Sequence, residues 1–163
     1  ALIFNFHPQD FESYQLDPLL RFAITMITSF CGVYGFSLMF NSTRKMAATA
    51  GLIGMIANTL RLELIDMAEI HVGLAAFIGA LTAGLLASAI HHWIGYPRIT
   101  LTVPSIVIMV PGMFMYKGIY YIALNDIATG GLWLTKAVLI VAALPLGLIF
   151  ARIITDKNFR KSS

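Results

Sequence analysis

The 163-residue sequence has little charge: aspartate, glutamate, lysine and arginine together make up only 12% of it. About a quarter of the residues are charged in a typical soluble domain, so water is not the main solvent of this chain. Its single cysteine, Cys31, excludes an internal disulfide and a cysteine-based metal site. The net charge of +3 is small and the basic residues are scattered, so nucleic acid is not an expected partner.

Motifs for covalent chemistry are also missing from the sequence. It contains no phosphate-binding glycine loop, no nucleophile elbow and no cluster of metal ligands. His91 and His92 are adjacent, so on a helix they point about 100° apart and do not chelate one metal together. His71 is a candidate proton relay, but we expect it to be a helix-start residue at the surface. We therefore expect no enzyme and no cofactor.

The sequence is instead rich in long apolar segments, and 58% of its residues are hydrophobic. A membrane-crossing helix needs about 20 mostly apolar residues. Five stretches meet this requirement, at about 19–41, 46–65, 70–93, 102–124 and 132–154. Because backbone groups must be paired within hydrocarbon, such segments indicate helices and not a barrel. We predict an all-α integral membrane domain over residues 19–154, after an outer segment or linker (1–18) and before a basic cytoplasmic tail (155–163).

Charges at the ends of these spans predict an orientation. Lysine and arginine near span ends favour the cytoplasmic side of a membrane. Seven of them fall at one set of ends: Arg44, Lys45, Arg98, Arg152, Lys157, Arg160 and Lys161. Seven of the eight acidic residues fall at the opposite ends. We therefore expect the N-terminus outside and the C-terminus in the cytoplasm.

Small residues recur at helical spacing in the second and third spans. Gly51 and Gly54 share one face of the second span, and Ala80 and Gly84 belong to a similar surface of the third. Small side chains let helix backbones approach closely inside a membrane. We therefore assign these four residues to helix packing.

The glycine face of the second span continues into two polar residues, Asn58 and Arg61. One interpretation is that the arginine extends to the nearby membrane surface. The other is that both residues line a polar pocket. Asn58 favours the pocket, because an amide that faces lipid at this depth would gain nothing.

The fourth span contains the segment IVIMVPGMFMYKG, residues 106–118, with Pro104 upstream. We expect Pro104 in the first helical turn, where proline costs little. Pro111 and Gly112 fall near the membrane centre, where proline removes a hydrogen bond and clashes with the Val107 carbonyl. We predict a broken span at this pair. Interrupted helices form substrate sites in many transporters, although a kinked packing helix is the alternative.

Lys117 is a further candidate, about 9 Å beyond Pro111 along a helix. It either extends to the outer surface or has a function, which is the default for a lysine inside a membrane. Together with Arg61 it would suit a solute that bears a carboxylate. The predicted substrate-binding residues are Asn58, Arg61, Pro111, Gly112 and Lys117.

Three segments that follow in order carry a family resemblance: GFSLMFN (35–41), GLIGMIANTLR (51–61) and VPSIVIMVPGMFMYKGI (103–119). Together they resemble the C-terminal, five-helix half of the threonine/serine exporter family. The chain also looks like the small subunit of two-component relatives linked to succinate export. The likeness covers about residues 22–154, and the span with the Pro-Gly pair is its most specific part. It carries over Asn41, Gly54, Arg61, Pro111 and Gly112, but not Lys117.

The resemblance implies an exporter of small carboxylates or amino acids, threonine-, serine- or succinate-like, in a bacterial inner membrane and driven by an ion gradient. It also implies a partner, a second five-helix half that carries a soluble cytoplasmic segment, within a hetero- or homo-oligomer. Two such halves would be inverted repeats. The other expected partner is membrane lipid. A non-transporting scaffold that anchors a partner subunit is the main alternative, and a passive channel is a weaker one.

Overall fold

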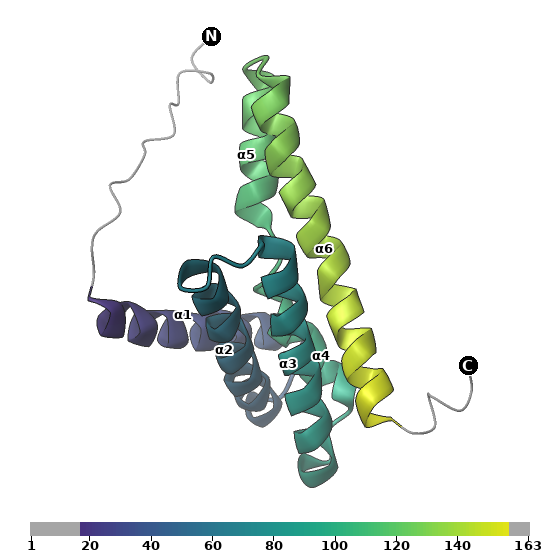
Figure 1. Ribbon diagram of the computed structural model, residues 1–163. Coiled ribbons are helices and arrows are strands. Elements are labelled where there is room, and N and C mark those ends of the chain that lie inside the picture. Colours follow the sequence, from purple (N-terminus) through teal and green to yellow (C-terminus); the bar gives the residue numbers. More distant parts are fainter. Residues whose placement is uncertain (1–16, 157–163) are drawn as a thin grey trace.

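The computed structural model describes residues 17–156, and these residues form helices and no strand (Figure 1). The helices are α1 (Pro18–Met39), α2 (Arg44–Asp66), α3 (Val72–Ile94), α4 (Arg98–Val107), α5 (Gly112–Ala123) and α6 (Ile127–Thr155). The chain is therefore all-α, as predicted. The expected outer segment 1–18 and basic tail 155–163 lie almost wholly outside the described residues.

Four of these helices, α1, α2, α3 and α6, are long and apolar enough to cross a membrane. The pair α4 and α5 passes the same test jointly, bent by 41° at a short break. By length and composition, the described residues thus contain four candidate membrane spans, or five if the bent pair is one span. The fourth predicted span corresponds to this pair.

The connections between helices use residues that tolerate a left-handed backbone. Asn41 (φ 61°) follows α1, Gly95 (φ 74°) ends α3 and Asn125 (φ 64°) separates α5 from α6. His71 begins α3, where its Nδ1 accepts a hydrogen bond from the Gly73 N–H at 3.3 Å. This capping contact is the helix-start role expected for His71.

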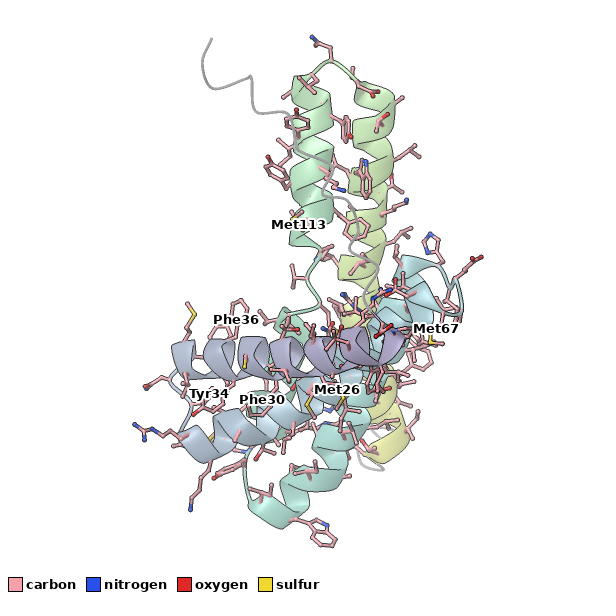
Figure 2. The ribbon with its side chains drawn as sticks, turned by 90° about the vertical axis from the view of Figure 1, so that its left-hand side faces the viewer. Met26, Phe30, Tyr34, Phe36, Met67 and Met113 are labelled. Carbon is pink, nitrogen blue, oxygen red and sulfur yellow. The ribbon has the colours of Figure 1, made fainter. Side chains whose placement is uncertain are left out.

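Helix α1 packs on α2 through the two predicted glycines. A Cβ on Gly51 would lie 2.8 Å from the Phe30 ring, and one on Gly54 would lie 2.5 Å from Val33 Cγ2. Figure 2 shows Phe30 and Tyr34 on the side of α1 that faces α2, where their rings stack with centroids 5.9 Å apart. The absence of side chains at Gly51 and Gly54 makes room for Phe30 and Val33.

Helix α6 lies along α3 and brings the two backbones into contact. A Cβ on Gly147 would lie 2.6 Å from the Phe77 carbonyl oxygen and 2.8 Å from Ala80 Cβ. On the other helix, a Cβ on Gly84 would lie 2.5 Å from Ala151 Cβ. Ala80 and Gly84 therefore face α6, and Gly147 is their counterpart on that helix.

Helix α5 and the first half of α6 form a hairpin that extends beyond the other helices (Figure 1). The two helices cross closely at glycine, because a Cβ on Gly130 would lie 2.8 Å from the Gly118 carbonyl oxygen. Met113 and Ile119 of α5 are more than half exposed. This hairpin offers a large apolar surface to lipid or to another protein.

The prediction for Pro104 is wrong. Helix α4 begins at Arg98, so Pro104 lies inside the helix and not in its first turn. Helix α4 starts directly after Pro97, and so it includes the polar residues that precede the apolar run. Pro104 is buried, and the next residue, Ser105, donates its hydroxyl to the Leu101 carbonyl at 2.6 Å.

Candidate functional site

The break between α4 and α5 covers residues 108–111 and ends at Pro111, directly before the first residue of α5. The Val107 carbonyl, which proline prevents from making its normal helical bond, accepts a hydrogen bond from the Val110 N–H at 3.1 Å. The Gly112 N–H donates to the Val110 carbonyl at 2.9 Å. Most of the interruption thus precedes the predicted Pro-Gly pair, because residues 108–110 form a turn before the proline.

Arg61 reaches this break from α2. Its Nη1 donates a hydrogen bond to the Met109 carbonyl oxygen at 2.9 Å, and Met109 lies between the two helices. The guanidinium group therefore contacts the backbone of a buried residue in the break between the two helices. Gly79 of α3 provides the space, since a Cβ there would lie 3.1 Å from Arg61 Cβ and 3.3 Å from the Met109 sulfur.

The guanidinium group of Arg61 also has an unused donor. Its Nε is buried and has no hydrogen-bond partner among residues 17–156. No carboxylate in that part of the chain forms an ion pair with Arg61, including Glu63, the nearest acidic residue in sequence. A buried positive charge without a partner is costly, so this position favours an anion supplied from elsewhere.

Asn58 lies one turn before Arg61 on α2 and faces α1. Its Nδ2 donates to the Ser29 hydroxyl at 2.9 Å, and the residue is buried. Its Oδ1 is buried without a hydrogen-bond partner among the described residues, as is the Thr59 hydroxyl. The amide is therefore inside the protein and retains a free acceptor. Ser29, its partner, stood out in no sequence pattern, because a single serine in an apolar run is ordinary.

The remaining predicted residues differ in their surroundings. Pro111 is buried at the break, whereas Gly112 is exposed and a Cβ on it would meet nothing within 4 Å. Lys117 lies on the α5–α6 hairpin, where its Nζ is 4.7 Å from the centroid of the Trp133 ring. Lys136 Nζ lies 5.1 Å from the same ring. The structure thus brings Arg61 to the break and places Lys117 in a separate cation–π contact.

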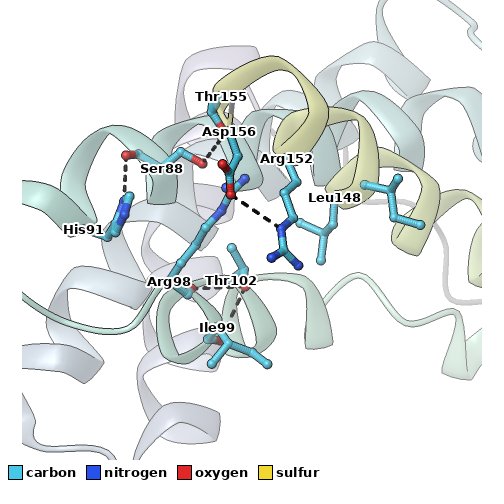
Figure 3. A pocket seen from close by; sticks show the side chains of 10 residues that line it. Ser88, His91, Arg98, Ile99, Thr102, Leu148, Arg152, Thr155 and Asp156 are labelled. Atoms are coloured by element: carbon cyan, nitrogen blue, oxygen red, sulfur yellow. Dashed lines mark hydrogen bonds and ion pairs between the residues drawn. The ribbon is translucent and has the colours of Figure 1, made fainter. Parts of the chain in front are cut away.

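A second polar region lies at the other end of α4, where it meets the ends of α3 and α6 (Figure 3). There a cavity of about 640 Å³ is lined by Ser88, His91, Arg98, Ile99, Thr102, Leu148, Ile149, Arg152, Thr155 and Asp156. Nothing in the sequence pattern predicted this cavity, because its two arginines come from helices far apart in the chain. We call it the basic-end cavity.

Metal binding has no support within residues 17–156, where no three histidine, cysteine, aspartate or glutamate residues come together in a group that could hold an ion.

Comparison with known proteins identifies the family. The family profile described as "Threonine/Serine exporter, ThrE" matches residues 25–154, which is most of the chain and includes α2, the break and α6. No curated protein and no solved structure matches the chain. The matched profile and the apolar helices together describe a multi-pass membrane protein of an amino-acid transporter family. The resemblance seen in the sequence is thus confirmed, and the chain belongs to the threonine/serine exporter family.

Proposed function

We propose that this chain is one half of a secondary exporter and that the carboxylate of its solute binds Arg61 beside the α4–α5 break. The observation that carries this proposal is the state of the guanidinium group: Nη1 donates to the Met109 carbonyl, while Nε is buried without a partner. An arginine held in this way by the protein presents its remaining N–H donors at a fixed place.

Carboxylates suit such a site for two reasons. The planar guanidinium donates two parallel hydrogen bonds to a carboxylate, and these charge-assisted bonds are about twice as strong as neutral ones. A bound anion also neutralises the buried cation, which the described residues do not do. We therefore expect a small amino acid of the threonine or serine type, with succinate-like dicarboxylates as a second class.

The ammonium group of an amino acid would need acceptors close to this arginine. Backbone carbonyls at a helix break supply such acceptors in secondary transporters, and the residues between α4 and α5 are of this kind. The Asn58 Oδ1, one turn away on α2, is a further unused acceptor. In this proposal the break binds the solute, and a change in the angle between α4 and α5 contributes to alternating access.

The topology we propose places the N-terminus outside and the C-terminus in the cytoplasm of a bacterial inner membrane. Its support is the positive-inside rule together with the arrangement of the helices. The C-terminal ends of α3 and α6 lie toward the bottom of Figure 1, and the loop between α5 and α6 lies toward the top. An ion gradient would drive export, and we propose no enzymatic step.

A second five-helix half with a soluble cytoplasmic segment would complete the transporter in a hetero- or homo-oligomer. The exposed apolar surface of the α5–α6 hairpin supports this proposal, because α5 packs against little besides α6 within the described residues. Two halves of opposite orientation would place the break of this chain at their interface, near the membrane centre.

An export assay in the original host tests the site. The chromosomal copy is replaced by Arg61→Ala, Arg61→Lys or the control Arg21→Ala, and efflux of labelled threonine is measured from loaded cells. Arg21 is an exposed arginine that pairs with Asp66 away from the break. We expect Arg61→Ala to reduce efflux more than about tenfold and Arg61→Lys to recover part of it, because lysine keeps the charge but not the paired geometry.

Two control measurements are needed to interpret this experiment. The amount of each variant in the membrane must equal that of the unchanged protein, and Arg21→Ala should retain its efflux. Unchanged threonine efflux by a normally assembled Arg61→Ala variant would exclude the proposed site. Counterflow of labelled threonine separates a carrier, which exchanges solute, from a passive channel, which does not.

A further inference from the structure

The basic-end cavity lies at the opposite end of α4 from the break and so is separate from the proposed solute site. Arg98 is the first residue of α4, and Arg152 is in the last turn of α6. In the proposed topology both arginines therefore lie near the ends of membrane-crossing helices, at the depth where lipid headgroups meet water. The ligand of this cavity should be sought among molecules present at that depth.

The charges around the cavity favour a singly charged anion. Arg152 Nε lies 4.0 Å from Asp156 Oδ2, and Figure 3 shows the Arg98 side chain beside the same carboxylate. The two guanidinium groups and the one carboxylate together carry one excess positive charge. A phosphodiester carries one negative charge, which matches this excess.

Hydroxyl groups line the wall between the helices. The Thr155 hydroxyl donates to Ser88 Oγ at 3.2 Å and so connects α6 with α3. The Thr102 hydroxyl, on the α4 side, is directed to the Arg98 carbonyl at 3.2 Å. Ser88 donates its own hydroxyl hydrogen to the Gly84 carbonyl at 2.6 Å, and Thr155 also lies 2.8 Å from the Ala151 carbonyl. The hydroxyl hydrogens are therefore already donated within the protein, and the two arginines supply the N–H donors for an anion.

The outer wall of the cavity is aliphatic. Ile99 and Ile149 line it and are 67% and 46% exposed, and Leu148 lies beside them. Side chains that line a cavity at this depth and also face outward from membrane-crossing helices contact acyl chains. The cavity thus combines a cationic, hydroxyl-rich inner part with an apolar opening toward the bilayer.

We propose that the basic-end cavity binds an anionic phospholipid, with its phosphodiester between Arg98 and Arg152 and its acyl chains along Ile99 and Ile149. Basic pockets between membrane helices bind the headgroups of acidic lipids in this manner. A free amino acid or dicarboxylate offers the same anionic oxygens but would leave the aliphatic wall without a partner. The proposal does not depend on export, because Arg61 and the break take no part in it.

Native mass spectrometry of the full chain, purified in a neutral detergent and titrated with phosphatidylglycerol, tests this proposal. The measured quantity is the Kd of the first bound lipid. We expect Arg98→Gln/Arg152→Gln to weaken it about thirtyfold, because both charge-assisted hydrogen bonds to the phosphodiester are lost. The matched control is Arg44→Gln/Lys45→Gln, which removes two exposed basic residues outside the cavity and should change the Kd by less than about threefold.

Further variants and ligands decide between lipid and solute. If the glutamine pair fails to fold, a second variant tests the aliphatic wall while the positive charges are kept. It combines Arg98→Lys and Arg152→Lys with Ile99→Asn and Ile149→Asn. We expect this variant to lose most of the affinity for phosphatidylglycerol. Equal weakening in the cavity pair and the control pair would overturn the proposal, as would equal affinity for phosphatidylcholine. Displacement of the lipid by inorganic phosphate or succinate at comparable concentrations would instead make the cavity a solute site and overturn it too.

Discussion

Two long segments of this protein contain a proline in their apolar interior, and only one of them is broken. Helix α6 continues through Pro145 without interruption from Ile127 to Thr155. The segment from Arg98 to Ala123 instead separates into α4 and α5 just before Pro111. Pro104, inside α4, also leaves its helix intact. Proline therefore does not by itself break a helix in this fold.

The difference lies in what surrounds each proline. Two residues after Pro145, Gly147 packs against the α3 backbone at Phe77, which brings the continuous α6 close to its neighbour. Near Pro111, the adjacent Gly112 has open space, and Arg61 donates to the Met109 carbonyl that the break exposes. A break persists where a donor from another helix satisfies the freed backbone, as the low dielectric of a membrane requires.

The largest effect should come from removing the close contact between α6 and α3. In Gly147→Leu the new side chain meets the Phe77 carbonyl oxygen, which is backbone and cannot move aside. Even a tight fit costs about 1–3 kcal/mol in a packed core, and leucine adds far more volume. We expect most of the folded protein to be lost, as measured by the monodisperse fraction in detergent gel filtration.

Gly131→Leu is the matched control, because it is the same substitution in the same helix at a glycine with nothing within 4 Å of the new Cβ. It should leave the monodisperse fraction nearly unchanged. Equal losses in both variants would show that the α3–α6 contact does not depend on Gly147.

The next effect concerns the prolines themselves. Pro111→Ala restores a backbone N–H at the break and permits a more regular helix there, whereas Pro145→Ala changes a helix that is already continuous. We expect threonine efflux to fall about tenfold or more in Pro111→Ala, since the site between α4 and α5 would close. Efflux should stay within about twofold in Pro145→Ala. Similar efflux by both variants would mean that the break has no role in transport.

Much of this fold was predictable from apolar length and turn residues. All-helical structure, the location of most helices and the interruption at Pro111 follow from residues read in order along the chain. The start of α4 at Arg98 was not predictable in this way. A span defined by hydropathy leaves out the polar residues before an apolar run, even when they are helical. That error placed Pro104 in the wrong part of its helix.

The candidate site was predictable only in part. Arg61 and Pro111 stood out because cations and prolines are unusual inside a membrane span. Their connection through the Met109 carbonyl, the hydrogen bond from Asn58 to Ser29 and the gathering of Arg98 with Arg152 depend on packing between separate helices. Helix spacing carries no information about which faces meet, and so it did not predict these contacts.

Gly79 provides a finer test of the contact between Arg61 and the break. In Gly79→Ala the new Cβ lies 3.1 Å from Arg61 Cβ, 3.2 Å from the Ala57 carbonyl oxygen and 3.3 Å from the Met109 sulfur. These three groups, one of them backbone, must shift by a few tenths of an ångström. We expect efflux to fall about three- to tenfold while assembly is kept, because binding sites are sensitive to displacements of this size. Gly35→Ala, where a Cβ meets nothing within 4 Å, is the control and should retain its efflux.

The smallest effect should come from Lys117, the second cation among the predicted substrate-binding residues. Its ammonium group lies over the Trp133 ring on the α5–α6 hairpin, a contact worth about 0.5–1 kcal/mol at an exposed position. Lys117→Met keeps the length and apolar stem of the side chain and removes only the charge. We therefore expect threonine efflux to change by less than about twofold. A loss of efflux comparable with that of Arg61→Ala would require the solute to pass along the hairpin. Comparing the efflux of the Arg61 and Lys117 variants therefore shows how far the site extends from the break.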